Sequence, residues 1–299
     1  MPENNSNNLS PQAKPTFAFF GTSAISVLVL EELKASGFIP KLIVTVDDKP
    51  KGRKMVLTPP ETKIWAQENN VPFVQLKTLR KPESLDAIKS FSSEGYDLFI
   101  VASYGKIIPQ EILDLPKYQT LNVHPSLLPR LRGPSPIKSA ILNENETGVT
   151  IMRLDAEMDH GPILAQKKIE VADWPPYEDD LEKILGVAGG KMLAEIIPQW
   201  IAGEINEQEQ DHSLATLCEK IKKEDGEINL DDSAEINLRK IRAYHVWPGA
   251  YFFLEMGEVK RRILVKRAHI EDSKLVIDRI VPEGKKEMDY KDFMRGLKK

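Results

Sequence analysis

Short apolar segments alternate with amphipathic ones along the first part of the chain. Residues 16–20 are apolar, 21–23 are small and polar, and 25–33 carry apolar residues at helical spacing. This pattern predicts a strand, a tight turn and a capped helix. The same alternation predicts strands at 41–46, 71–76, 97–102 and 120–123, and helices at 60–69 and 83–92. We therefore expect an α/β, Rossmann-like domain with a largely parallel sheet and helices on both faces.

The pattern changes in the second half. Apolar segments at 148–154 and 163–170 predict a strand pair around the loop 155–162, and 179–201 predicts a long amphipathic helix. Further helices are predicted at 214–223 and 234–244, and strands near 250–254, 260–269 and 274–281. Helices followed by strands predict a second, mainly β domain. The predicted division is a disordered lead at 1–14, an α/β domain at 15–203, a linker at 204–211 and a C-terminal domain at 212–299.

Composition and charge narrow the class of protein. With 41% hydrophobic and 29% charged residues, the chain is typical of soluble globular proteins. No apolar run reaches the ~20 residues of a membrane span, and the Asn-rich start lacks the apolar core of a signal peptide, so we expect a cytoplasmic protein without membrane contact. The single cysteine, Cys218, excludes an intramolecular disulfide framework. Residues 259–299 hold 13 Lys and Arg against 7 Asp and Glu, although the whole chain has a net charge of −4. Such a basic end fits either a polyanionic partner or a solvated tail.

Candidate catalytic groups lie in two polar clusters. Asn122 and His124 stand two residues apart where an apolar segment meets a proline-rich loop. If the segment is a strand, both side chains point to the same face. Asp159 lies in the second cluster and adds a carboxylate. A lone pair of this kind is often only a satisfied buried pair, and an Asp near a Gly is often a turn residue. Amide, imidazole and carboxylate together suit acyl-group transfer.

Residues 47–60 form a second feature, a long basic loop. Most loops between strands and helices have about 2–6 residues, so a loop of this length is either disordered or a binding loop. Phosphate contacts are expected from its four cations, Lys49, Lys51, Arg53 and Lys54. The sequence contains neither G-x-G-x-x-G nor a P-loop, and no metal-binding motif, so no nucleotide fingerprint and no metal site are predicted.

With these residues identified, the chain resembles the 10-formyltetrahydrofolate-dependent formyltransferases over nearly its whole length after the lead, and among them the methionyl-tRNA formyltransferases. The matching segments are 21–22, 48–53, 102–109, 122–137, 146–152, 158–163, 220–226, 247–250 and 282–288. The segment 122–129 followed by Asp159 is highly specific for formyl transfer from the folate. It does not choose the acceptor. The basic loop and the basic end favour tRNA.

The resemblance implies a role for each matching residue. Asn122 and His124 would stabilise the oxyanion, and Asp159 would orient His124 and take up the proton of the methionyl amine. Folate would dock on Tyr104, Gly105 and Ile107 and on Ser126, Leu127, Leu128 and Pro129. Initiator methionyl-tRNA would contact the basic loop and, on an OB-like C-terminal barrel, Arg261, Arg262, Lys285 and Lys286. The formyl donor is a co-substrate, no metal is implied, and we expect a monomer.

The resemblance leaves some alternatives open. The stretch between Glu258 and Ile280 is too short for a barrel of the family's usual size, so one or two strands would be missing. A formyltransferase acting on an amino-sugar nucleotide would share all three catalytic residues and differ in having no need of the basic loop and tail. A non-catalytic folate- or RNA-binding module is the alternative from another class, and it would require the loss of a catalytic group.

Overall fold

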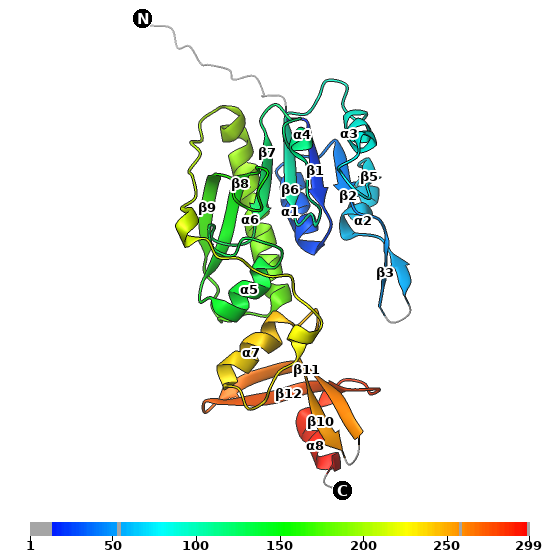
Figure 1. The fold of residues 1–299 in the computed structure, drawn as a ribbon, viewed down its shortest axis with the longest axis vertical. Helices are drawn as coiled ribbons and strands as arrows, with labels where there is room; N and C mark the ends of the chain where they lie inside the picture. The colour runs from blue at the N-terminus through cyan, green and yellow to red at the C-terminus, as the bar shows by residue number, and fades with distance from the viewer. Residues whose placement is uncertain (1–13, 53–54, 257–258, 298–299) are drawn as a thin grey trace, which may run out of the picture.

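The computed structural model describes residues 14–52, 55–256 and 259–297. Apart from Lys14, the predicted lead 1–14 lies outside these residues. Figure 1 shows two layered domains placed end to end along the long axis, with the larger sheet in the first domain and a smaller sheet in the second.

The larger sheet has seven strands in the order β5–β2–β1–β6–β7–β8–β9. The first five are parallel, and β8 and β9 continue the sheet in antiparallel register. The strands are β1 (Phe17–Gly21), β2 (Leu42–Thr45), β5 (Phe73–Gln75), β6 (Leu98–Ala102), β7 (Thr120–His124), β8 (Thr147–Arg153) and β9 (Ile163–Ile169). The prediction of a largely parallel α/β sheet is confirmed.

Helices cover both faces of this sheet. The apolar residues of β1 and β6 are buried on both sides, which is why these strands lack polar alternation. One face packs against α1 and α6, and the other packs against α3 and α4. The helices of the domain are α1 (Ala24–Ala35), α2 (Glu61–Glu68), α3 (Pro82–Lys89), α4 (Gln110–Leu113), α5 (Pro136–Asn143) and α6 (Glu178–Ile201). Neither α4 nor α5 was predicted.

A glycine on α6 fixes the orientation of β7. A Cβ at Gly189 would lie 2.6 Å from Cγ1 of Val123, so only a residue without a side chain allows α6 to pack this closely on the strand. Val123 therefore faces α6. Because side chains alternate along a strand, Asn122 and His124 face the opposite side of the sheet.

The chain reverses direction across the sheet between β1 and β6. From β1 it moves outward through β2 to β5, and it then returns to pair β6 with the free side of β1. The carboxyl ends of these strands meet, and Ser23 donates a hydrogen bond to Oγ of Ser103 at 2.8 Å. Ligands of open α/β sheets bind at such a switch point. His124, the last residue of β7, lies at the same edge.

The described residues of 47–60 include two paired strands, where the sequence predicted a long loop. Strands β3 (Lys49–Lys51) and β4 (Val56–Thr58) pair in antiparallel register and project from the first domain in Figure 1. Three residues are too few to show period-two alternation, and proline, here Pro50, is uncommon within strands. The base of the hairpin is fixed, because Lys63 on α2 donates to both carboxylate oxygens of Asp48 at 2.8 and 2.9 Å.

The prediction of a helix at 214–223 is wrong, because no α-helix is present there. A single 3-10 turn, η1 (His212–Leu214), precedes an extended stretch, and a second 3-10 turn, η2, covers Glu224–Gly226. The extended stretch pairs with the first domain: Arg132 donates its backbone N–H to Thr216 O at 2.9 Å, and Cys218 donates to Arg132 O at 2.8 Å. These tertiary contacts outweigh the local helical spacing.

The second domain is built on a four-stranded antiparallel sheet in the order β10–β11–β12–β13. Helices α7 and α8 pack on one face of it. The elements are α7 (Ala234–Ala243), β10 (Tyr251–Met256), β11 (Val259–Glu271), β12 (Lys274–Pro282), β13 (Met288–Asp289) and α8 (Tyr290–Leu297). Among the described residues this sheet has four strands, whereas an OB barrel has five. The sequence did not predict β13 or α8.

Side-chain contacts join the two domains. Arg239 of α7 donates to the carbonyl oxygens of Ile141 and Glu144 at 3.0 and 2.7 Å. At the start of α6, Asp179 lies 3.0 Å from Nδ1 of His245, which follows α7. The second domain is thus attached to α5 and α6.

Candidate functional site

The end of β7 carries the amide and the imidazole predicted from the sequence. Asn122 and His124 are 7% and 4% exposed, on the face of the sheet opposite α6. Among the described residues, the side-chain amide of Asn122 makes no hydrogen bond. Its amide atoms are not fully buried, so the amide is free to bind water or a ligand.

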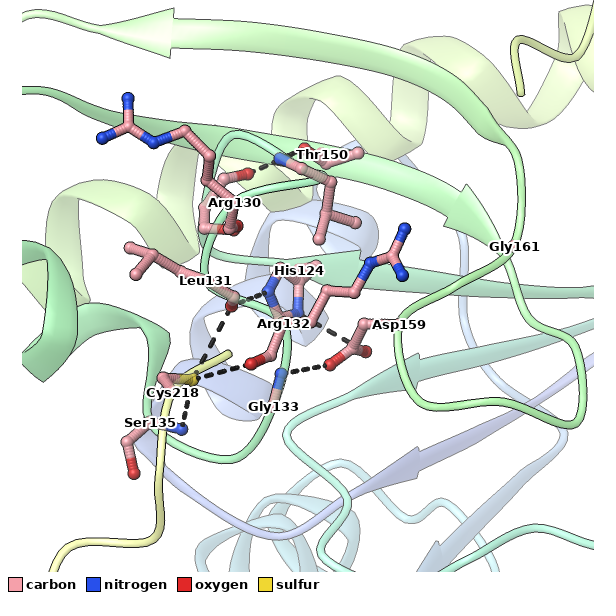
Figure 2. Close-up of polar contacts among 12 residues, drawn as sticks. His124, Arg130, Leu131, Arg132, Gly133, Ser135, Thr150, Asp159, Gly161 and Cys218 are labelled. Carbon is pink, nitrogen blue, oxygen red and sulfur yellow. Dashed lines mark hydrogen bonds and ion pairs between the residues drawn. The ribbon is translucent and has the colours of Figure 1, made fainter. Parts of the chain in front are cut away.

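His124 is held between two acceptors. Its Nε2 lies 3.0 Å from the carbonyl oxygen of Leu131, so Nε2 carries the hydrogen and donates it. Nδ1 faces Asp159, and the distance to Oδ1 is 3.6 Å. This distance is too long for a hydrogen bond. A proton placed on Nδ1 would face the carboxylate directly, as the close-up in Figure 2 shows.

Asp159 projects from the 155–162 loop toward His124. Its backbone is left-handed, with φ of 52°, an uncommon state for a residue other than glycine. Its Oδ2 accepts the backbone N–H of Gly133 at 2.8 Å. A Cβ on Gly161 would overlap the carbonyl oxygen of Arg153, which explains the glycine two residues later. His124 of β7 and Asp159 therefore lie side by side, although they are 35 residues apart in the chain, and Asn122 lies two residues before His124 on the same face of the strand.

The neighbouring His160 is not part of this group. Its Nδ1 lies 2.8 Å from Asp155, and its ring stacks on His212 with centroids 4.1 Å apart. His212 belongs to the segment after α6, which the sequence predicted as the end of a linker and the start of a domain.

That segment contains site residues that the sequence analysis missed. Gln210 is 5% exposed and donates to the backbone oxygens of Asp159 and Gly161, while Arg132 donates to Gln210. No local signal marks Gln210, which stands in a run of polar and acidic residues. The Arg-Leu-Arg-Gly sequence that contains Arg132 could be recognised in the chain, but nothing in the sequence indicated that Arg132 bonds to Gln210.

The predicted folate-binding residues lie in two loops at the same sheet edge. Among the described residues, 104–107 make no backbone–backbone hydrogen bond, and the buried Tyr104 hydroxyl has no partner. Burial, with a smaller contribution from Asp47, raises the pKa of Tyr104, so it stays a hydrogen-bond donor. Ile107 is 69% exposed. Unpaired backbone groups beside an apolar side chain suit a flat heterocycle with several donors and acceptors.

The second loop is more tightly held. Ser126 donates its hydroxyl to Arg130 O at 2.7 Å, and Leu128 donates its N–H to Thr150 at 3.2 Å. Leu127 packs against Gly148, where a side chain would collide with it. Pro129 follows a cis peptide bond. This loop leads directly from His124 to Leu131, so it is part of the same site.

Of the basic-loop residues, Lys49 and Lys51 lie exposed on β3. Arg53 and Lys54 lie outside the described residues. On the same hairpin, Val56 and Leu57 are 59% and 64% exposed. Hydrogen bonds from Lys63 and Gln75 lower the pKa of Asp48 at its base, so the anchoring carboxylate is ionised at neutral pH.

The C-terminal cations do not all lie together. Arg262, Lys285 and Lys286 line a pocket of about 340 Å³ on the open face of the second sheet. The guanidinium of Arg262 stacks 3.8 Å above the ring of Tyr251. Arg261 points to the other face, because its register partner Leu254 packs into the core beneath the helices. The structure therefore separates Arg261 from the other three predicted contacts.

Within residues 14–52, 55–256 and 259–297, no group of three or more His, Cys, Asp or Glu side chains is placed to hold a metal ion. None of the helices in these same ranges has the length and apolar character needed to cross a membrane.

Comparison with protein families gives two matches. Residues 15–197 match the family model described as formyl transferase. Residues 220–274 match the model described as formyl transferase, C-terminal domain. The first match covers more than half of the chain and contains the three candidate catalytic residues, Asn122, His124 and Asp159.

Curated relatives are similar over most of the chain. A methionyl-tRNA formyltransferase of a Geobacillus species is 35% identical over 302 residues, which cover 93% of this chain and 93% of the relative. The methionyl-tRNA formyltransferase of Chloroflexus aggregans is 42% identical over 239 residues, covering 79% of this chain and 75% of the relative.

Solved structures share the fold at low sequence identity. The methionyl-tRNA formyltransferase of Clostridium thermocellum has a TM-score of 0.59 at 17% identity, covering 90% of this chain and 98% of its own. A sugar N-formyltransferase of a Shewanella species has a TM-score of 0.60 at 16% identity, covering 91% and 99%. HypX of Aquifex aeolicus in complex with tetrahydrofolic acid has a TM-score of 0.63 at 17% identity, covering 96% of this chain and 48% of HypX. These likenesses confirm the predicted fold.

Proposed function

This chain belongs to the formyl transferase family, and we propose that it transfers the formyl group of 10-formyltetrahydrofolate to the α-amino group of initiator methionyl-tRNA. The observation that carries the proposed chemistry is the His124–Asp159 pair at the carboxyl end of β7, with the uncommitted amide of Asn122 two residues earlier on the same face of the strand. Bound 10-formyltetrahydrofolate would supply the formyl carbon.

Asn122 is the group best suited to stabilise the oxyanion. Its amide is uncommitted, whereas both ring nitrogens of His124 face protein acceptors. In a nearly buried site, a fixed amide donor stabilises developing negative charge without reorganising solvent. A protonated His124 would add positive charge beside it.

The His124–Asp159 pair is suited to take up the proton of the attacking amine. Because Nε2 donates to Leu131, Nδ1 is the nitrogen that can accept a proton. Asp159 Oδ1 is 3.6 Å away and would bind the resulting N–H after a small approach. A free α-amine has a pKa of about 8, so a modest base is enough near neutral pH.

The folate is expected at the two loops beside His124. The unpaired backbone of residues 104–107 and the orphaned Tyr104 hydroxyl would bind the donors and acceptors of the pterin. The segment from Ser126 to Pro129 would form the opposite wall. These residues bind and orient the donor and take no part in proton transfer.

Cationic surface on both domains supports tRNA as the acceptor. Lys49 and Lys51 lie on a hairpin that, in Figure 1, points toward the end of the molecule holding the second domain. Arg262, Lys285 and Lys286 line the pocket on that domain. Spaced cations of this kind bind a phosphate backbone. A monomer in the cytoplasm, where initiator tRNA is charged, completes the proposal.

An amino-sugar nucleotide is the second candidate acceptor. Sugar N-formyltransferases share this fold, and the catalytic group would serve either amine. Such a small acceptor leaves the hairpin and the C-terminal pocket without a role. A non-catalytic binding module is not supported, because amide, imidazole and carboxylate are all present.

The test is a direct choice of acceptor. The purified protein is incubated with 10-formyltetrahydrofolate and, in parallel, with charged initiator methionyl-tRNA, charged elongator methionyl-tRNA and a panel of amino-sugar nucleotides. We expect formylmethionyl initiator tRNA as the main product. Formylation of a sugar nucleotide without formylation of tRNA would show that the acceptor is the sugar nucleotide and not tRNA. The absence of formyl transfer to every acceptor would overturn the whole proposal.

A further inference from the structure

Gln210 lies outside the catalytic group but is bound to its backbone on two sides. Its side chain is 5% exposed, and its Nε2 donates to the carbonyl oxygens of Asp159 at 3.0 Å and Gly161 at 2.7 Å. Both hydrogens of this amide are therefore used on the loop that carries Asp159. That loop is left-handed at Asp159 and needs such support.

Arg132 fixes Gln210 from the other side. Its Nε and one terminal nitrogen donate to Oε1 of Gln210 at 3.1 and 2.7 Å, and the same terminal nitrogen lies 2.8 Å from Nδ1 of His212. With the oxygen held by a guanidinium, the amide of Gln210 has only one orientation, with its nitrogen toward Asp159. Arg132 itself is 7% exposed.

The position of Arg132 in the chain links this pair to both catalytic side chains. Its neighbour Leu131 accepts the hydrogen bond of His124, and its other neighbour, Gly133, donates to the carboxylate of Asp159. Figure 2 shows these contacts around Arg132. The hydrogen bonds of Arg132 and Gln210 therefore connect the loop after His124 to the 155–162 loop that carries Asp159. The separation of these two loops sets the distance between His124 and Asp159.

We propose that Gln210 is a positioning residue for formyl transfer, which, together with Arg132, holds the Asp159 loop at the distance from His124 that proton transfer requires. The inference rests on the proposed function of the His124–Asp159 pair. It also gives the segment after α6 a role, because that segment ties the connection between the domains to the catalytic carboxylate.

The decisive variant is Gln210→Glu. A carboxylate still accepts from Arg132, so the buried guanidinium keeps its partner, but the two donated hydrogen bonds to Asp159 and Gly161 are lost. We expect kcat to fall about 10- to 100-fold, as for small displacements of catalytic groups, with KM for folate and acceptor within about twofold of the original. Gln208→Glu is the matched control, because it introduces the same charge two residues away on an exposed side chain. It should leave kcat unchanged.

A double-mutant cycle separates positioning from general loosening. In the Asp159→Asn background, Gln210→Glu should lower the single-turnover rate by less than about twofold, since the group that it positions is already disabled. An equal loss in both backgrounds, or a normal kcat in Gln210→Glu, would overturn the inference. If Gln210→Glu melts at a much lower temperature, Arg132→Lys, which keeps the charge but not the two-pronged contact, goes through the same cycle with the same criteria.

The acceptor question is kept apart from this test. The double-mutant cycle is measured with whichever acceptor the unmodified protein formylates. The positioning role of Gln210 can therefore be tested, and refuted, even if that acceptor is not tRNA. Asp159→Asn with normal turnover would refute the role of Asp159 and the positioning role together. A strongly impaired Asp159→Asn with a normal Gln210→Glu would refute the positioning role alone.

Discussion

Asn122 is the residue whose surroundings say most about the chemistry. Its side-chain amide bonds no described residue and keeps some exposed surface, so its donor is available to a ligand. Its neighbour His124 has both ring nitrogens facing protein acceptors. In the proposed mechanism, oxyanion stabilisation by direct hydrogen bonding is therefore assigned to Asn122, and proton uptake to His124 with Asp159.

The first prediction concerns this amide. Asn122→Ala and the isosteric Asn122→Asp should each lower kcat by about 100- to 1,000-fold, because each removes the donor that the oxyanion needs. Since the amide bonds no described residue, the melting temperature should change little. Steady-state kinetics and thermal denaturation check both statements. Turnover near normal in Asn122→Asp would show that donation by this amide is not required.

At this scale, part of the site could be predicted from the sequence. Asn122 and His124 follow from the two-residue period of a strand, Asp159 was selected as the carboxylate of the second polar cluster, and the resemblance assigned its role. Gln210 could not be predicted, since its value depends on a contact with Asp159, 51 residues earlier in the chain. Arg261 was grouped with Arg262 as a tRNA contact, but adjacent residues of a strand face opposite sides.

Elements with strong periodicity were predicted well, and elements fixed by tertiary contacts were not. The long helix predicted at 179–201 is α6, with its first residue at Glu178. The segment 214–223 has apolar residues at helical spacing, yet it is extended because it pairs with the loop after β7. The β3–β4 hairpin was too short to show a period at all.

The second prediction concerns the first turns of α6. Burial, and next the nearby Glu178, raise the pKa of Glu182 above its ordinary value. The folded state therefore holds the proton more tightly than the unfolded state, and stability falls as the pH rises from the ordinary pKa to the raised one. Glu182→Gln should raise the melting temperature at pH 7–8 by about 1–3 °C and have a smaller effect near pH 4.

Asp180→Asn is the control for this prediction. It removes the same charge from the same helix, but its carboxylate is exposed and lies 3.8 Å from Lys183. It should not raise the melting temperature at any pH. Equal melting temperatures for Glu182→Gln and the unmodified protein at every pH would show that burial of Glu182 has no cost.

The whole molecule combines the proposed catalytic edge of the sheet with cationic side chains on both domains. The order of the domains could be predicted from the change in pattern along the sequence. Their attachment could not, because it depends on single long side chains such as Arg239 and on the segment around Gln210. The same segment bonds to the loop that carries Asp159, so the connection between the domains and the proposed catalytic site share residues.

The last prediction tests whether the C-terminal pocket binds the phosphate backbone. Each phosphate contact contributes a slope of about −0.7 to −0.9 to the plot of log affinity against log salt. Arg262→Ala should flatten the slope for initiator methionyl-tRNA by about that amount and leave KM for the folate unchanged. Arg261→Ala is the matched control, since it removes the same charge one residue away on the opposite face of the sheet. Equal slopes for the two variants would mean that the pocket does not contact tRNA, and an amino-sugar acceptor, which carries too few phosphates for a steep slope, would then regain support.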